Sequence, residues 1–195
     1  MSGCECNCGD ADEEQYVKVQ GSDVYFYCEV NELTIRELIM KLRALELDLL
    51  KKYLDLNITT KPVIRLFIRS DGGDIFAGWS GMDAIQSLKR VKVRTIADGC
   101  CASAATFLLL GGYTRHMTEN SYVLIHQLNT DGVWGKYEEL KDHINNFDMY
   151  MKRFREIYGT YTKLPEKKLK KLMKRDLYLD ATSCLKWDVV DSIIL

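Results

Sequence analysis

The sequence lacks the features that would place it in a membrane or on a nucleic acid. No apolar run reaches the roughly 20 residues that a membrane-spanning helix needs. The first residues, MSGCECNCGDADEE, are polar and acidic, without the basic segment or the apolar core of a secretory signal. The formal net charge of -1 gives no broad field that would attract nucleic acid or an anionic lipid surface. We therefore expect a cytoplasmic protein with no membrane and no nucleic acid among its partners.

Internal repeats and long linkers are also absent. The 195 residues have the length of one ordinary domain, and 47% of them are hydrophobic, which is enough for a sizeable core. We expect one folded domain over residues 21–195.

The cysteines do not indicate a disulfide framework, because there are seven of them and they are scattered. Cys4, Cys6 and Cys8 crowd the start of the chain, but no downstream C-x-x-C or H-x-x-x-H motif follows to complete a metal site. The first 16 residues hold almost no large apolar side chains to bury. We interpret residues 1–20 as a disordered, cysteine-rich tail and assign no metal ligands, with a metal site in this tail as the alternative.

Hydrophobic periodicity predicts strands alternating with helices. Thr34 and Glu37 form a T-x-x-E pattern typical of a helix start, and apolar residues recur at helical spacing from there to about residue 54. The predicted strands are VYFYCEV (24–30), KPVIRLFIRSDGG (61–73), VKVRTIAD (91–98), SYVLIH (121–126) and VVDSIIL (189–195). Further helices are predicted over 75–90, from about residue 103, over 137–158 and over 163–175. This alternation predicts an α/β fold with a mainly parallel sheet and flanking helices.

The longest predicted helix has a regular apolar stripe. Its members recur in steps of three and four residues: Tyr137, Leu140, Ile144, Phe147, Met151, Phe154 and Tyr158. Packing against the domain's own sheet is the simpler interpretation for a single helix, but the stripe also fits a second subunit. We expect burial between subunits, with Ile144 and Phe147 as contact residues. The basic segment 163–175 is interpreted as a solvated helix face, with nucleic-acid binding as the alternative.

Three polar residues follow predicted strands, where α/β proteins gather function. Ser103 opens a helix after the strand 91–98, His126 ends the strand 121–126, and Asp176 follows the basic helix. A serine nucleophile needs an imidazole to take its proton and a carboxylate to hold the imidazole. Cys100 and Cys101 are rival nucleophiles in the same loop, although their apolar neighbours suggest buried, inert thiols.

The glycines of SDGG, residues 70–73, can supply an oxyanion hole, because glycine lets a backbone N–H turn toward a substrate. Each of these motifs is weak alone, since a serine at a helix start is usually a cap and Gly-Gly is usually a turn.

Taken together, the motifs resemble the Clp protease proteolytic subunit (ClpP) family of serine peptidases from about Val24 to the C-terminus. IRSDGGDIFAGWSGMDAIQSL resembles the family's Asn-Ser-Pro-Gly-Gly segment and the helix after it. DGCCASAATFLLLGG resembles the nucleophile loop, SYVLIHQ the histidine segment, and KRDLYLDATSCLKWDVVDSIIL the segment with the catalytic aspartate.

The resemblance implies a ClpP/crotonase-type fold with a protruding handle helix, and a peptidase that needs no cofactor. It makes Ser103 the nucleophile, His126 the general base and then acid, and Asp176 the residue that orients His126. It also implies that Gly73 and Ala104 stabilise the oxyanion through their backbone N–H groups.

For assembly, the resemblance implies two stacked heptameric rings around a chamber. Unfolded proteins or peptides would be the substrates, and a separate AAA+ unfoldase would be the partner that uses ATP. The stripe from Tyr137 to Tyr158 falls at the family's ring-to-ring handle, and Arg175 matches the arginine that links subunits across the rings.

The chain departs from the family pattern at several positions. Asp71 replaces the proline of the Pro-Gly-Gly segment, Leu128 replaces a proline after the histidine motif, and Asp188 stands where a glycine usually follows the last helix. Arg65 replaces an aromatic residue of the pocket where ATPase loops dock, and residues 4–8 replace the usual pore segment. These departures change the surface on which an ATPase would dock.

Two other functions stay open. One is a catalytically silent ring subunit with a structural or regulatory role, which the altered turn at Asp71 and the unusual cysteines suggest. The other is an acyl-CoA enzyme of the crotonase superfold, which uses oxyanion stabilisation but does not need a Ser, His and Asp set.

Overall fold

The computed structural model describes residues 16–130 and 132–194. Its elements are β1 (Val17–Gln20), β2 (Asp23–Phe26), α1 (Glu32–Asp55), β3 (Val63–Ser70), α2 (Ile75–Ser87), β4 (Lys92–Ala102), α3 (Ala105–Leu110), β5 (Thr114–Thr118), β6 (Tyr122–Leu124), α4 (Tyr137–Tyr161), α5 (Glu166–Leu172), β7 (Tyr178–Leu179), α6 (Ala181–Lys186) and β8 (Ser192–Ile194). Within these residues, no helix is long and apolar enough to cross a bilayer.

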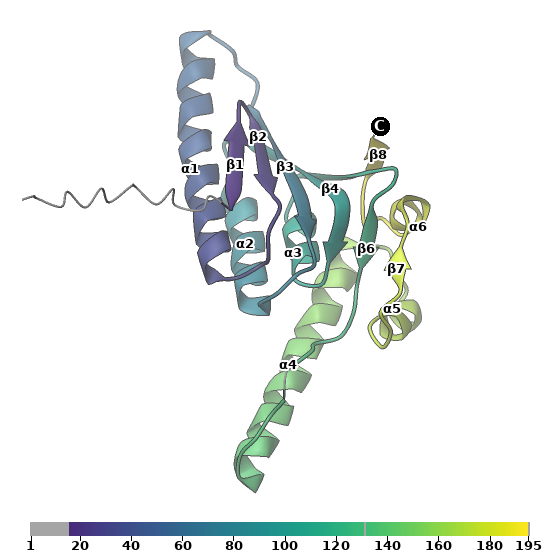
Figure 1. Ribbon diagram of the computed structural model, residues 1–195. Coiled ribbons are helices and arrows are strands. Elements are labelled where there is room, and N and C mark those ends of the chain that lie inside the picture. Colours follow the sequence, from purple (N-terminus) through teal and green to yellow (C-terminus); the bar gives the residue numbers. More distant parts are fainter. Residues whose placement is uncertain (1–15, 131, 195) are drawn as a thin grey trace, which may run out of the picture.

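One sheet organises the chain, with the strand order β1-β2-β3-β4-β5-β8. The pairs from β2 through β8 are parallel, and only β1 joins this path antiparallel. Farther along β4, its last residues pair with β6, and β7 adds antiparallel to β6. The helices α1, α2 and α3 pack beside one another against the sheet (Figure 1). The predicted α/β fold with a mainly parallel sheet is confirmed.

The core lies between the sheet and these three helices. Along β3, Ile64, Leu66 and Ile68 are buried while Arg65 and Arg69 are exposed, as the period of two in the sequence predicts. Every residue of α3 is buried, so the helix that follows Ser103 is packed on all sides and holds the neighbouring loop in place.

The start of α1 differs from the prediction. The helix begins at Glu32, and Asn31 is its N-cap, with the Thr34 N–H donating to Asn31 Oδ1 at 3.0 Å and the Asn31 N–H donating to Thr34 Oγ1 at 3.1 Å. Thr34 is therefore the third residue of the helix. Glu37, expected to complete the cap, lies 2.7 Å from Lys41 Nζ instead.

Residues 17–20 correct the expected disordered tail, because they form β1. Val17 is fully buried, and its N–H donates to Glu37 Oε1 at 3.3 Å. The alternation in this stretch covers only four residues, which is too short to separate a strand from a polar tail without its partner strand. Cys4, Cys6 and Cys8 lie outside the described residues.

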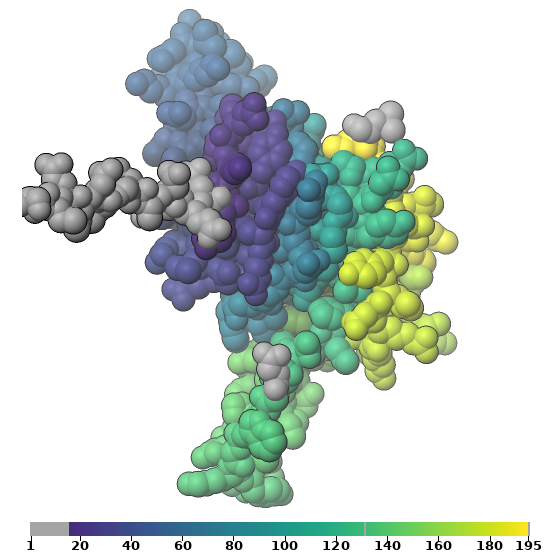
Figure 2. All heavy atoms as spheres, viewed as in Figure 1, coloured from purple at the N-terminus to yellow at the C-terminus, as the bar shows by residue number. Residues whose placement is uncertain are grey.

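The long helix α4 leaves the body of the molecule as an arm (Figures 1 and 2). Near its end, Phe154 and Tyr158 are buried in the chain's own core, so the expectation that the whole stripe lies between subunits is wrong for them. The first half of the helix is different, because Tyr137 is 70% exposed and Ile144 is 59% exposed. The stripe thus divides into a half anchored in the core and a projecting half, in which Leu140 and Phe147 are half-buried while Tyr137 and Ile144 are exposed.

Candidate active site

Ser103 lies at the junction between β4 and α3, with a left-handed backbone conformation at φ 54°. A non-glycine residue seldom adopts this conformation, and it costs on the order of 1–3 kcal/mol unless the surroundings enforce it. Here the Ser103 N–H donates to the Leu124 carbonyl at 2.9 Å, where β4 pairs with β6. The sharp turn presents the Ser103 hydroxyl at the carboxyl end of the strand.

His126 lies two residues beyond β6, and its Nε2 is 2.7 Å from Ser103 Oγ. On the other side of the ring, Nδ1 is 3.2 Å from Asp176 Oδ1. With Nδ1 donating to the carboxylate, Nε2 is free to accept the Ser103 proton. The three side chains predicted from the sequence therefore form one chain of hydrogen bonds.

The pairing of β6 with β7 explains how Asp176 reaches His126 across 50 residues of sequence. Leu124 lies opposite Tyr178 in this antiparallel pair. Asp176 precedes β7 by two residues and His126 follows β6 by two residues, so both lie beyond the same end of the ladder. Asp176 remains open to solvent, since its side chain is 77% exposed.

Two glycines lie against the Ser103 turn. Gly72 and Gly73 have φ values of 104° and 139°, which side chains rarely allow. A Cβ on Gly72 would lie 2.5 Å from Ser103 Cβ, and a Cβ on Gly73 would lie 2.2 Å from the Val30 carbonyl oxygen. Only glycine fits at either position. The family resemblance implies a role for Gly73 but none for Gly72, although both belong to the same SDGG motif.

The parallel bridge between Val30 and Gly73 leaves the backbone N–H of Gly73 free to donate to a substrate. In their parallel bridge, the Val30 N–H donates to the Gly72 carbonyl at 2.8 Å and the Asp74 N–H donates to the Val30 carbonyl at 2.7 Å. Because alternate residues of an extended chain point to opposite sides, the Gly73 N–H points away from Val30. Among the hydrogen bonds of the described residues, neither Gly73 N–H nor Ala104 N–H serves as a donor.

The rival thiols are poor nucleophiles in this environment. Cys101 is completely buried, and burial raises its pKa far above the usual range. Cys100 is half-buried, and burial together with a hydrogen bond to Asp71 raises its pKa. A raised pKa lowers the fraction of reactive thiolate, so the hydroxyl of Ser103 is the better candidate. The described residues include no group of three or more His, Cys, Asp or Glu side chains placed to hold a metal ion.

A cleft of about 540 Å³ lies beside the glycine turn, with walls from Tyr27, Cys28, Glu29, Arg69, Ser70, Asp71, Gly72, Gly73 and Cys100. Arg69 is held over this region by a 3.0 Å ion pair with Asp98. Arg65, four residues earlier on β3, forms two hydrogen bonds with Asp23, at 2.5 and 2.6 Å. The sheet face around Arg65 therefore carries a paired charge beside the stacked rings of Tyr25 and Phe67.

The other predicted contact residues are not part of this site. Arg175 is exposed beside Asp176 and has no ion-pair partner within residues 16–130 and 132–194. Ile144 and Phe147 lie on the projecting half of α4. A single chain leaves these three residues without the contacts that were expected for them.

Comparison with known proteins gives one family. The family model described as Clp protease matches residues 19–195. The chain is 34% identical over 145 residues to an ATP-dependent Clp protease proteolytic subunit of Cyanophora paradoxa, a match that covers 73% of each chain. It is 31% identical over 133 residues to ATP-dependent Clp protease proteolytic subunit 2 of Bacillus licheniformis, covering 67% of this chain and 69% of the relative.

Proposed function

Because this chain belongs to the Clp protease family, we propose that it is a serine endopeptidase that cleaves peptides and unfolded proteins. The observation that carries the proposal is the 2.7 Å contact between His126 Nε2 and Ser103 Oγ, together with the 3.2 Å contact between His126 Nδ1 and Asp176. This geometry matches what a hydroxyl nucleophile needs, which is a base within hydrogen-bond reach and a third group that orients the base.

In the proposed reaction, Ser103 Oγ attacks the carbonyl carbon of the scissile peptide bond while His126 Nε2 takes the hydroxyl proton. The C–N bond then breaks, and His126 gives that proton to the departing amine, which leaves an ester on Ser103. Water then loses a proton to His126 and attacks the ester carbonyl, the bond between the acyl carbon and Ser103 Oγ breaks, and His126 returns the proton to Oγ as the acid product leaves. Asp176 keeps the proton of the resting imidazole on Nδ1 and stabilises the imidazolium. No cofactor enters these steps, and ATP would be used only by a separate ATPase partner.

The developing oxyanion would be stabilised by the N–H groups of Gly73 and Ala104. The turn that carries Gly73 lies against Ala104, since a Cβ placed on the preceding residue, Gly72, would be 3.1 Å from the Ala104 nitrogen. Ala104 also precedes the first turn of α3, where backbone N–H groups favour negative charge. Removing one such donor typically costs about 10²–10³-fold in kcat.

A fluorophosphonate probe tests the proposal directly, because it acylates only an activated serine. We expect a covalent mass increase that maps to Ser103, and Ser103→Ala should lose at least ~10³-fold of the activity against a fluorogenic peptide. Ser87→Ala is the matched control, since Ser87 is exposed and its hydroxyl contacts only the Ala84 carbonyl. Activity retained by Ser103→Ala would remove Ser103 as the nucleophile.

A catalytically silent ring subunit is the second candidate. The observation that favours it is Asp71, a carboxylate in the turn immediately before Gly72 and Gly73. A negative charge there opposes the negative charge of an oxyanion. If a folded oligomer takes no label from the fluorophosphonate, the silent function replaces the peptidase.

We also propose that the chain assembles in the cytoplasm into two stacked heptameric rings that enclose the Ser103 sites. The projecting half of α4, with Ile144 and Phe147, would form the contact between rings, and Arg175 would take part in it. An AAA+ unfoldase would deliver unfolded proteins. The ion pair between Arg65 and Asp23 adds paired charge to the sheet face on which such a partner would dock. Short peptides should be cleaved without the unfoldase, because they need no unfolding to enter the chamber.

A further inference from the structure

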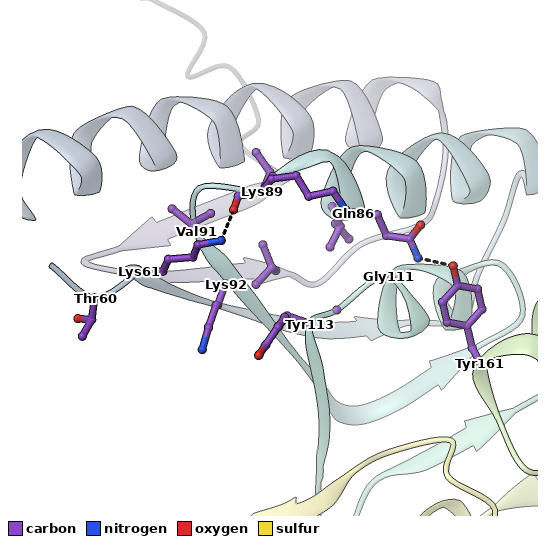
Figure 3. A pocket seen from close by; sticks show the side chains of 13 residues that line it. Thr60, Lys61, Gln86, Lys89, Val91, Lys92, Gly111, Tyr113 and Tyr161 are labelled. Carbon is purple, nitrogen blue, oxygen red and sulfur yellow. Dashed lines mark hydrogen bonds between the residues drawn. The ribbon is translucent and has the colours of Figure 1, made fainter.

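Figure 3 shows a second cavity, of about 850 Å³. It lies at the opposite end of β4 from Ser103. It is formed where α2 ends, where β4 begins, and at the turn between α3 and β5. β4 runs 11 residues from Lys92 at this cavity to Ala102 beside Ser103, a length of roughly 30 Å at 3.3 Å per residue. A ligand in this cavity cannot reach a peptide bound at Ser103.

The floor of the cavity is apolar. Ile85, Leu88, Val91 and Val93 line it and are all buried within the fold. The volume is within the range of about 300–1,000 Å³ that is usual for small-molecule sites. The cavity therefore has room for a small organic molecule and a surface on which its apolar part can rest.

Positive charge dominates the rim. Lys61, Lys89 and Lys92 line the cavity, and no aspartate or glutamate is among its lining residues. None of these three lysines forms an ion pair anywhere in the described part of the chain. Lys61 is nevertheless held in place, because its Nζ donates to the Lys89 carbonyl at 2.9 Å (Figure 3). Three uncompensated ammonium groups around one hollow attract an anion with more than one charge.

Two tyrosines add a neutral donor and an aromatic surface. Tyr161 accepts a hydrogen bond from Gln86 Nε2 at 2.9 Å, which leaves the hydroxyl proton of Tyr161 to donate (Figure 3). Tyr113 is 65% exposed, and Lys92 Nζ lies 4.7 Å from the centre of its ring. A ring of a ligand could therefore lie against Tyr113 while its charged group meets the lysines.

We propose that this cavity binds a small organic phosphate with at least two negative charges, its phosphate held by Lys61, Lys89 and Lys92 and its ring or apolar part placed on the floor and against Tyr113. Phosphate suits the site better than a single carboxylate, because it offers more charge and more acceptor oxygens to three separate ammonium groups. The proposal does not depend on the peptidase activity of Ser103.

Calorimetric titration of the full chain with two probes, ADP and tripolyphosphate, tests the proposal. ADP carries phosphate and an aromatic base, whereas tripolyphosphate carries only the charge. We expect ADP to bind more tightly than tripolyphosphate, and the triple variant Lys61→Gln, Lys89→Gln, Lys92→Gln to bind ADP at least about tenfold more weakly.

The matched control is Lys51→Gln, Lys167→Gln, Lys171→Gln, which removes the same charge from exposed positions elsewhere. It should bind ADP within about twofold of the wild type. In a second variant, Tyr113→Ala should weaken ADP and leave tripolyphosphate unchanged. Equal losses in the two triple variants would mean general charge attraction and overturn the site. Equal affinity for ADP and tripolyphosphate would show that the ligand needs no organic part. No binding of either probe at millimolar concentrations would overturn the phosphate site altogether.

Discussion

The Tyr158 hydroxyl lies 2.6 Å from Thr106 Oγ1, and this contact joins α4 to α3 directly behind Ser103. Thr106 Oγ1 in turn donates to the Ser103 carbonyl at 2.6 Å. Tyr158 and Thr106 are both buried, so water cannot replace either partner. The base of the projecting helix is thereby linked to the backbone of the proposed nucleophile.

Substitutions of Tyr158 and Thr106 should lower the free energy of unfolding by different amounts. Tyr158→Phe leaves Thr106 bonded to Ser103 and should lower the free energy of unfolding by about 1 kcal/mol. Thr106→Val leaves the buried Tyr158 hydroxyl without a partner and should cost more, about 2–3 kcal/mol. Denaturant titration measures both losses. Tyr113→Phe is the control at an exposed tyrosine, and it should change the free energy of unfolding by less than ~0.5 kcal/mol. A larger cost for Tyr158→Phe than for Thr106→Val would contradict the link.

Gly73→Ala should reduce the kcat of peptide cleavage by at least about 10²-fold, because the new Cβ would meet the Val30 carbonyl at 2.2 Å and displace an oxyanion donor. Gly21→Ala is the control for backbone strain. Gly21 also has a positive φ, 61°, but nothing lies within 4 Å of a Cβ there. The Gly21→Ala variant should lose about 1 kcal/mol of unfolding free energy and keep the kcat of the wild type. Steady-state kinetics that show equal effects of the two substitutions would remove the oxyanion role of Gly73.

Replacing Ile144 and Phe147 by Asp should split the proposed double ring and suppress peptide cleavage, although both residues lie outside the Ser103 site. Burying each of these side chains is worth about 1.5–3 kcal/mol, repeated at every copy of the contact. Asn145→Asp with Asn146→Asp adds the same charge to the same helix without removing apolar area, and it should leave the particle intact. Light scattering distinguishes the two, and a stable 22.5 kDa wild-type monomer would refute the assembly.

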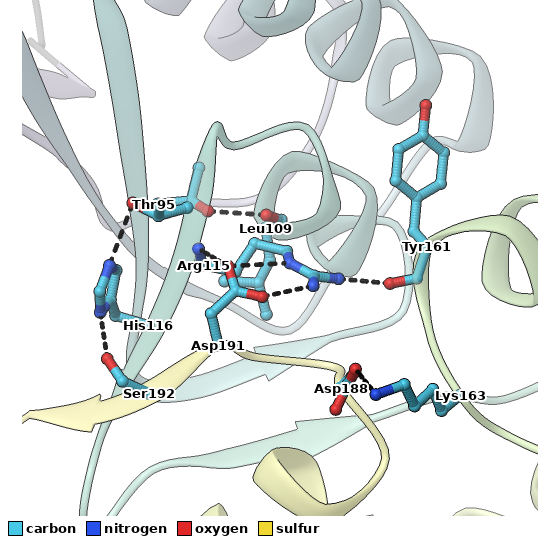
Figure 4. A network of polar contacts seen from close by, with 10 residues as sticks. Thr95, Leu109, Arg115, His116, Tyr161, Lys163, Asp188, Asp191 and Ser192 are labelled. Carbon is cyan, nitrogen blue, oxygen red and sulfur yellow. Dashed lines mark hydrogen bonds and ion pairs between the residues drawn. The ribbon is translucent and has the colours of Figure 1, made fainter.

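Asp191 should make stability depend on pH. Arg115 donates to it from Nη2 at 2.6 Å and from its backbone N–H at 2.7 Å (Figure 4). Burial raises the pKa of Asp191, but these bonds and the Arg115 charge together lower it below its ordinary 3.8. The unfolded chain therefore binds this proton more readily, and the stabilisation is present above the ordinary pKa and lost as the pH falls through the lower folded value.

The difference in unfolding free energy between wild type and Asp191→Asn should accordingly be full at neutral pH and shrink below about pH 4. Asp188→Asn serves as the control, because Lys163, which is exposed, is the ion-pair partner of Asp188 among the described residues and such pairs contribute little. A difference between wild type and Asp191→Asn that stays constant down to pH 2 would show that the charge of Asp191 does not stabilise the fold.

Local patterns in the sequence were enough to predict most of the elements. The alternation around Ile64, Leu66 and Ile68 predicts the two faces of β3, since side chains of a strand point to opposite sides. The shorter elements β1, β5, β7 and α6 were not predicted, because two to six residues carry too little periodicity to identify. In α1, both Asn31 and Thr34 are good caps, and only the folded backbone shows that Asn31 is the N-cap.

By itself, the sequence determined which residue types stand at the ends of strands, including Ser103, His126, Asp176 and the glycines of SDGG. Tertiary structure decided that these groups meet, because the pairing of β4 with β6 and of β6 with β7 brings residues 50 positions apart within 3.2 Å. It also divided the apolar stripe of α4, since Phe154 and Tyr158 reach the core while Ile144 projects beyond it. Helical spacing places residues on one face of a helix, but where the helix leaves the body depends on contacts distant in sequence.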